Sequence, residues 1–251
     1  MSTFKDNFSQ HADLYVKYRP HYPDALYAFL AEQTAAHDLA WDCGTGNGQA
    51  AIGLTPYYKN IIATDPSQQQ INNCLHHPQI DYKVEKAEHS SIATNSIDLI
   101  TIANALHWFD FDAYFAEAYR VLKPNGWLAA WAYFVPTSIP EIDKVVHDYH
   151  YNTLKAYWLP ENGYVENSYR DIPFPFDTIA TPEFVCEKEL NLSDFIHYLS
   201  TWSATQRYLK MHGRNPADDL VTALQKYWPT PTSTQKITWR LVLKMGKKRN
   251  R

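Results

Sequence analysis

The sequence predicts an α/β fold organised around a mostly parallel β-sheet. Within residues 38–133, short apolar runs alternate with segments of helical character. The run at 96–105 is rich in isoleucine and leucine, as a parallel strand covered on both faces should be. Strands that alternate with helices of this length are joined by right-handed crossovers, which makes them parallel neighbours in one sheet.

Seven strands are expected from apolar or β-branched runs along the chain. They lie at residues 39–43, 61–65, 81–87, 96–105, 127–133, 183–190 and 235–246. The last strand follows closely on the helices before it, so we expect it to be antiparallel and near an edge of the sheet.

Helices are expected on both faces of this sheet, and local signals mark some of their ends. Pro66 suits the first turn of one helix, and the turn signal at 123–126 closes another. Residues 136–182 carry many prolines and aromatic side chains, and no regular element is predicted there. The predicted helices are 24–35, 49–55, 68–77, 111–122, 192–202 and 218–228.

Composition narrows the classes of function. The chain has 251 residues, 45% of them hydrophobic and 20% charged, with a formal net charge of −4. That charge gives no attraction to nucleic acid or to an anionic membrane, and no apolar run is long enough to span a bilayer. The start lacks a signal-peptide pattern, and three cysteines without a CxxC pair indicate reduced thiols in a cytoplasmic protein. We expect a monomer or a homodimer.

The stretch LAWDCGTGNGQAA, residues 39–51, is the strongest candidate for a binding site. Three glycines follow the first strand, where ligands of open parallel sheets bind. Glycines leave the backbone N–H groups open to a ligand. Asp65 ends the second strand and is expected beside this loop, where a carboxylate can accept both hydroxyls of a ribose. A purely structural alternative is a glycine turn with Asp65 capping the next helix.

The identity of the nucleoside depends on the loop's details. A nicotinamide-binding GxGxxG loop would carry a third glycine at position 49, but this chain has Gln49. Asp42 places an acid at the entrance of the loop, where it would favour an ammonium group. A ligand with an amino-acid end and a ribose suits both acids, and S-adenosylmethionine has that shape.

Together these motifs resemble the class I S-adenosylmethionine-dependent methyltransferases, in particular the small-molecule group with a methyltransferase type 11 domain. WDCGTGNGQAA and IIATDPSQQQI are similar to the family's first two motifs, and KAEHSSIATNSIDLITIANALHWF and RVLKPNGWLAAWAY to its later ones. HADLYVKYRPHYP and the segment from TWSATQRYL to ITWRLVLKM resemble a subgroup related to trans-aconitate methyltransferases and yeast small-molecule methyltransferases. The resemblance covers most of the chain and implies a Rossmann-like fold.

The resemblance also implies a division of the chain and a set of donor contacts. A single methyltransferase domain, 1–251, would comprise a lid segment (1–34), a donor-binding half (35–135), an insertion over the sheet (136–182) and C-terminal strands and helices (183–251). Asp42, Gly44 and Gly46 would hold the methionine part of the donor, and Asp65 its ribose. The other implied donor contacts are Tyr15 and Arg19 in a lid, Pro66, Ala87 and Glu88 beside the adenine, and Asn104 and Ala105 beyond the fourth strand.

The reaction chamber is expected around His107 and Trp108. His107 is the candidate base for a hydroxyl or amine acceptor, and the alternative is that it only packs or hydrogen-bonds there. A carboxylate acceptor would need no base. Six aromatic residues are candidates for an apolar acceptor wall, with packing of the insertion as the alternative; they are Tyr133, Phe134, Tyr157, Trp158, Trp202 and Tyr208.

The expected function is therefore methyl transfer from S-adenosylmethionine to a small molecule, with no metal. A carboxylate or hydroxyl acceptor is favoured, and O-, N- and C-methylation stay open. The alternatives are an RNA or protein methyltransferase on the same fold and a non-catalytic S-adenosylmethionine-binding module. The first alternative would require a basic face, which the net charge of −4 does not favour.

Overall fold

A computed structural model describes residues 18–249 of the chain. Eight strands within this range form one sheet in the order β3-β2-β1-β4-β5-β8-β6, and β7 also pairs with β8. The strands are β1 (Leu39–Cys43), β2 (Asn60–Asp65), β3 (Ile80–Val84), β4 (Ile97–Ala103), β5 (Leu122–Tyr133), β6 (Asp177–Thr178), β7 (Phe184–Leu190) and β8 (Gln235–Lys247).

The topology confirms a mostly parallel sheet with an antiparallel last strand. Strands β1 to β5 pair in parallel, whereas β8 is antiparallel to β5 on one side and to β6 and β7 on the other. The eighth strand is the two-residue β6, too short to leave a pattern in the sequence. Strand order reverses between β1 and β4, which opens a crevice at the carboxyl ends of these strands.

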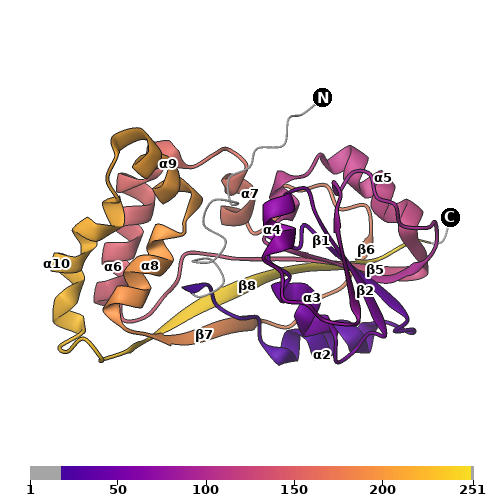
Figure 1. Cartoon of the computed structure of the whole chain (residues 1–251), viewed down its shortest axis with the longest axis horizontal. Helices are drawn as coiled ribbons and strands as arrows, with labels where there is room; N and C mark the ends of the chain where they lie inside the picture. The colour runs from indigo at the N-terminus through magenta and orange to yellow at the C-terminus, as the bar shows by residue number, and fades with distance from the viewer. Residues whose placement is uncertain (1–17, 250–251) are drawn as a thin grey trace.

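Helices cover both faces of the sheet, as expected. In Figure 1, α2 and α3 lie on one side of the strands and α5 on the other. The side chains of β5 alternate between these two faces: Trp131 belongs to the apolar core with α2 and α3, and its neighbour Ala130 to the core with α5. The helices of this half are α2 (Asp24–Gln33), α3 (Gln49–Leu54), α4 (Gln68–Asn72) and α5 (Phe111–Val121).

The remaining helices gather beyond the carboxyl ends of the parallel strands. Figure 1 shows α6, α8, α9 and α10 together at the far ends of β7 and β8, with α7 nearer the sheet. Their bounds are α6 (Pro140–Asp148), α7 (Asn162–Glu166), α8 (Leu192–Ser200), α9 (Ser203–His212) and α10 (Val221–Leu224). Within the described residues, no helix is both long and apolar enough to cross a membrane.

Several helices differ from the sequence prediction. Helix α4 ends at Asn72 rather than at 77, because asparagine side chains compete with helical hydrogen bonds. Residues 136–182 do contain helices: Pro140 starts α6, which buries Ile142 and Val146 one turn apart. The predicted helix 218–228 is a short α-helix between two 3-10 segments, and α9 was not predicted at all.

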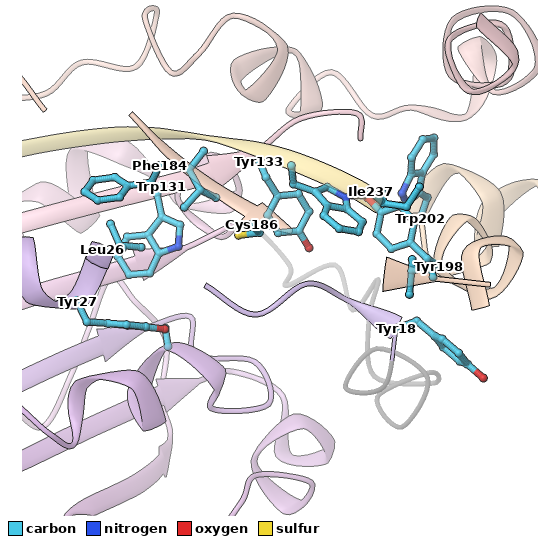
Figure 2. Packing of buried hydrophobic residues seen from close by; sticks show 14 of the residues in the cluster. Tyr18, Leu26, Tyr27, Trp131, Tyr133, Phe184, Cys186, Tyr198, Trp202 and Ile237 are labelled. Carbon is cyan, nitrogen blue, oxygen red and sulfur yellow. Dashed lines mark hydrogen bonds between the residues drawn. The ribbon is translucent and has the colours of Figure 1, made fainter. Parts of the chain in front are cut away.

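One apolar core joins the sheet to the helical group. Figure 2 shows Trp131 and Phe184 at one end of a row of side chains along β8, and Tyr198 and Trp202 at the other. Tyr133 lies between them, and all five belong to one buried cluster. Aromatic rings thus continue from the sheet into the region beyond the carboxyl ends of the strands, where the crevice opens.

Candidate active site

The glycine loop connects β1 to α3 and is open on one side. Gly44, Gly46 and Gly48 all have positive φ, at 69°, 55° and 84°, a conformation that side chains rarely tolerate. Among the described residues, no atom would lie within 4 Å of a methyl group added at Gly46. Residues 18–249 therefore leave free space above the middle of the loop, as backbone recognition of a ligand requires.

Asp65 lies beside this loop, as the sequence predicts. Its Oδ2 accepts a hydrogen bond from the backbone N–H of Gly46, and its Oδ1 from that of Ser67, both at 2.9 Å. The Ser67 hydroxyl in turn accepts from the N–H of Gln70 and caps α4. Asp65 thus links the glycine loop to the start of the next helix.

Asp42 does not stand at the entrance of the loop and is completely buried. Its two oxygens accept hydrogen bonds from the hydroxyls of Thr45, at 2.5 Å, and Thr101, at 2.8 Å. Burial, the largest effect, raises the pKa of Asp42 to about 6, although these two hydroxyls act in the opposite direction. In this structure Asp42 holds the loop through Thr45, and its contact with the methionine part of a donor stays a prediction.

Replacing Asp42 by Asn is expected to remove a pH-dependent part of the stability. Because the folded-state pKa of about 6 lies above the ordinary 3.8, the carboxyl group stabilises the fold below about pH 4, and this stabilisation is lost as pH rises through 6. Two pKa units correspond to about 3 kcal/mol. In urea unfolding, the free energy of unfolding of D42N relative to that of the wild type should rise by about that much between pH 4 and pH 7. A difference that is constant with pH would contradict the shift.

The residues expected beside the adenine lie next to the start of α5. Ala87 is buried, and Glu88 accepts a hydrogen bond from the backbone N–H of Asp110 at 3.1 Å. Asp110 is the N-cap of α5. Glu88 therefore connects the segment after β3 to the segment after β4, at the same edge of the sheet as the glycine loop.

Asn104 makes the sharp turn at the end of β4. It has a positive φ of 54°, and its side-chain oxygen accepts a hydrogen bond from the N–H of Tyr133 at 3.2 Å. Its amide group donates to the hydroxyl of Tyr22 at 3.3 Å. The turn brings Ala105 so close to Gly44 that an added Cβ at Gly44 would lie 2.7 Å from the Cβ of Ala105. The loops after β1 and β4 are thus in direct contact.

A cavity of about 350 Å³ opens beside this contact. Its wall includes many of the residues predicted for the site, namely Arg19, Asn104, His107, Trp108, Tyr133, Phe134, Trp158 and Trp202. Tyr157 and Tyr208 are not part of the wall; they pack against each other. Residues that the sequence did not indicate complete it, namely Val135, His150, Tyr151, Asn162, Val165, Glu166, Tyr198 and Ser203.

Two consecutive residues of the predicted lid, Arg19 and Pro20, contact the cavity wall and the start of α3. The side-chain amide of Gln49 donates to the carbonyl of Pro20 at 2.9 Å. Arg19 donates to the hydroxyls of Tyr133, at 2.8 Å, and Thr201, at 3.0 Å. Tyr15 lies outside the described residues, so its role in a lid stays a prediction, and Arg19 is placed in the cavity wall.

His107 is buried at the end of the cavity nearest β4. It belongs to a short 3-10 helix, η2 (Leu106–Trp108), and its Nδ1 lies 3.1 Å from the hydroxyl of Tyr169. Burial lowers the pKa of His107 to about 3, so the ring is neutral at physiological pH. A histidine with so low a pKa is a weak base, which bears on the proton-acceptor role considered for it.

Fold and site together define a class of protein. The strand order β3-β2-β1-β4-β5 with an antiparallel β8, and a glycine loop beside an acid at the end of β2, make this a Rossmann-like class I methyltransferase fold. The methyltransferase domain family matches residues 41–130. The chain belongs to the class I S-adenosylmethionine-dependent methyltransferases.

Individual relatives agree with this family. A Dictyostelium discoideum protein named as a methyltransferase is 33% identical over 238 residues, covering 93% of this chain and 90% of its own length. A solved structure from Anaeromyxobacter dehalogenans, described as a type II methyltransferase, has a TM-score of 0.86 and 36% identity, and covers 93% of this chain and 99% of that one. A Saccharomyces cerevisiae protein named as an S-adenosylmethionine-dependent methyltransferase is 26% identical over 63% of this chain and 56% of its own.

Proposed function

We propose that this methyltransferase acts on a small molecule bound in the cavity beside the glycine loop. The observation that carries the proposal is the contact between the two loops: Asn104 lines the cavity, and its neighbour Ala105 packs against Gly44. Asp65 would hold the ribose of the donor, and the open backbone at Gly46 its methionine part. A cavity of about 350 Å³ is of the size that binds a small ligand.

Methyl transfer requires the protein mainly to orient the acceptor relative to the donor. Bound S-adenosylmethionine supplies a methyl group activated by a positively charged sulfur. The chain's residues would align an acceptor atom with that methyl group and keep water out, since in-line displacement needs close and collinear approach. The aromatic wall, with buried rings such as Trp202 and Tyr198, would serve both purposes.

The polar groups in the cavity favour an acceptor that carries oxygen. Arg19, His107 and Tyr133 lie on the same wall, and a cation with a phenol and an imidazole suits a carboxylate or a hydroxyl group better than a purely apolar ligand. A macromolecular acceptor is the weaker candidate, because the chain carries a net charge of −4. We propose a cytoplasmic monomer or homodimer, in line with three free cysteines.

Two successive measurements test the proposal. Calorimetry with S-adenosylmethionine tests donor binding. Mass spectrometry of a whole-cell extract, incubated with the protein and isotopically labelled donor, then reveals any methylated metabolite, RNA or protein. A labelled small molecule supports the proposal. Donor binding without any labelled metabolite favours a non-catalytic binding module, and label found only in RNA or protein favours a macromolecular acceptor.

His107→Gln is expected to lower turnover by more than about tenfold while donor affinity stays unchanged. The substitution removes an imidazole from the cavity wall but leaves the glycine loop and Asp65 in place. Rates with a methylated metabolite and calorimetry with S-adenosylmethionine would measure the two effects separately. The control is His147→Gln, because His147 is exposed on α6 and outside the cavity wall. Equal turnover of the two variants would exclude a role for His107 in the reaction.

A further inference from the structure

A strained turn presents one buried tyrosine to His107. Ser168 and Tyr169 are consecutive and both have positive φ, at 58° and 55°, although neither is glycine. Such residues are uncommon singly, and a pair persists only where the surrounding structure holds it. Tyr169 is fully buried, and its hydroxyl lies 3.1 Å from Nδ1 of His107.

Lys244 holds this turn from the neighbouring strand. Its ammonium group donates to the carbonyl oxygens of Tyr169, at 2.8 Å, and Ile172, at 2.9 Å. Lys244 lies on β8 opposite Ala130 of β5, so the turn is fixed to the centre of the sheet. A backbone hydrogen bond from the N–H of Tyr169 to the carbonyl of Tyr164, at 2.7 Å, closes the other side. The position of the phenol is therefore determined by the fold.

The chemistry of the two rings sets the direction of the hydrogen bond between them. Burial raises the pKa of the Tyr169 phenol, so it keeps its proton. A phenol O–H is the better donor and an imidazole nitrogen the better acceptor of the two, so Nδ1 of His107 accepts. A neutral imidazole whose Nδ1 accepts carries its proton on Nε2. Within residues 18–249, Nε2 of His107 has no hydrogen-bond partner, and His107 lines the cavity.

We propose that Tyr169 is a positioning residue that holds His107 in the Nε2–H tautomer, so that His107 donates a hydrogen bond to the acceptor substrate instead of taking a proton from it. The inference deepens the proposed function and rests on it. An N–H group on a residue of the cavity wall favours an acceptor oxygen that has a lone pair and no proton to lose, as a carboxylate has. In that transfer the oxygen forms a bond to the methyl carbon, the sulfur–carbon bond breaks, and its electron pair stays on sulfur. No proton moves.

Nitrogen-15 NMR of the imidazole groups tests the tautomer without any donor or acceptor. In the wild-type protein, His107 is expected to carry its proton on Nε2, with Nδ1 hydrogen-bonded to the Tyr169 hydroxyl proton. In Tyr169→Phe the two tautomers should become mixed. Tyr164→Phe is the matched control, because its phenol makes contact with Phe111 and not with His107, and it should leave the wild-type pattern unchanged.

A proton on Nδ1 in the wild type would overturn the proposal, since the Nε2 lone pair would then face the cavity as a base. An unchanged Nε2–H tautomer in Tyr169→Phe would overturn it as well, because Tyr169 would not be what sets it. If Tyr169→Phe fails to fold, the wild-type spectrum still decides the position of the proton. Calorimetry with S-adenosylmethionine on the same wild-type sample keeps a failure of the proposed function separate from a failure of this inference.

Discussion

Asp65→Ala is expected to weaken S-adenosylmethionine binding by at least about 100-fold, since two hydrogen bonds to a charged group contribute about 3 kcal/mol or more. Asp65 already accepts hydrogen bonds from the N–H groups of Gly46 and Ser67, which fix its carboxylate beside the loop. The two ribose hydroxyls would donate hydrogen bonds to this carboxylate. Calorimetry on the purified variant measures the loss directly.

The matched control for this variant is Asp81→Ala. Asp81 lies on the adjacent strand β3 and forms only an exposed ion pair with Lys83, at 3.4 Å. Exposed pairs of this kind contribute little, so donor binding and stability should both stay close to wild type. Thermal unfolding of Asp65→Ala is needed alongside, because this variant also loses the link between the loop and α4. Wild-type affinity in Asp65→Ala, with the fold intact, would remove the ribose-binding role.

The placement of Asp65 beside the glycine loop could be predicted from the sequence because its signals are local. The glycine loop follows one strand directly, Asp65 ends the next, and parallel strands bring both to one edge of the sheet. The burial of Asp42 could not be predicted in this way. It depends on Thr101, which is 59 residues further along the chain and meets Asp42 only through the pairing of β1 with β4.

The far wall of the cavity was harder to predict for a different reason. His150 and Glu166 come from short helical segments, residues 149–153 and α7, in a region of many prolines and aromatic residues, where apolar periodicity is interrupted. The two residues are only 16 positions apart, and their hydrogen bond of 3.0 Å depends on how these two segments are oriented. Ser203 lies at the start of α9, a helix that the sequence pattern does not predict. Tyr169 leaves no signal either, because left-handed turns are predicted from glycine and asparagine, and this one has serine and tyrosine.

Gly44→Ala is expected to disrupt both stability and donor binding. An added Cβ would lie 2.7 Å from the Cβ of Ala105 and 3.1 Å from the ring of Phe109, closer than such atoms approach. Gly44 also has a φ of 69°, where an alanine is strained by about 1–2 kcal/mol. Overpacking adds about 1–3 kcal/mol, so we expect a total loss of about 2–5 kcal/mol in urea unfolding. Because the loops after β1 and β4 must move apart, S-adenosylmethionine binding should be lost as well.

Two other glycines separate the steric effect from the conformational one. Gly46→Ala has a similar φ of 55° but meets no atom of residues 18–249 within 4 Å, so it should lose only about 1–2 kcal/mol of stability. Its methyl group would nevertheless occupy the space left for the donor, and calorimetry should show weakened binding. Gly163→Ala, in α7, has neither positive φ nor a close neighbour among the described residues and should be as stable as the wild type.

If Gly44→Ala matched Gly163→Ala in stability, the contact between the two loops would not be as close as the structure shows. If Gly46→Ala bound the donor normally, the methionine part would lie elsewhere.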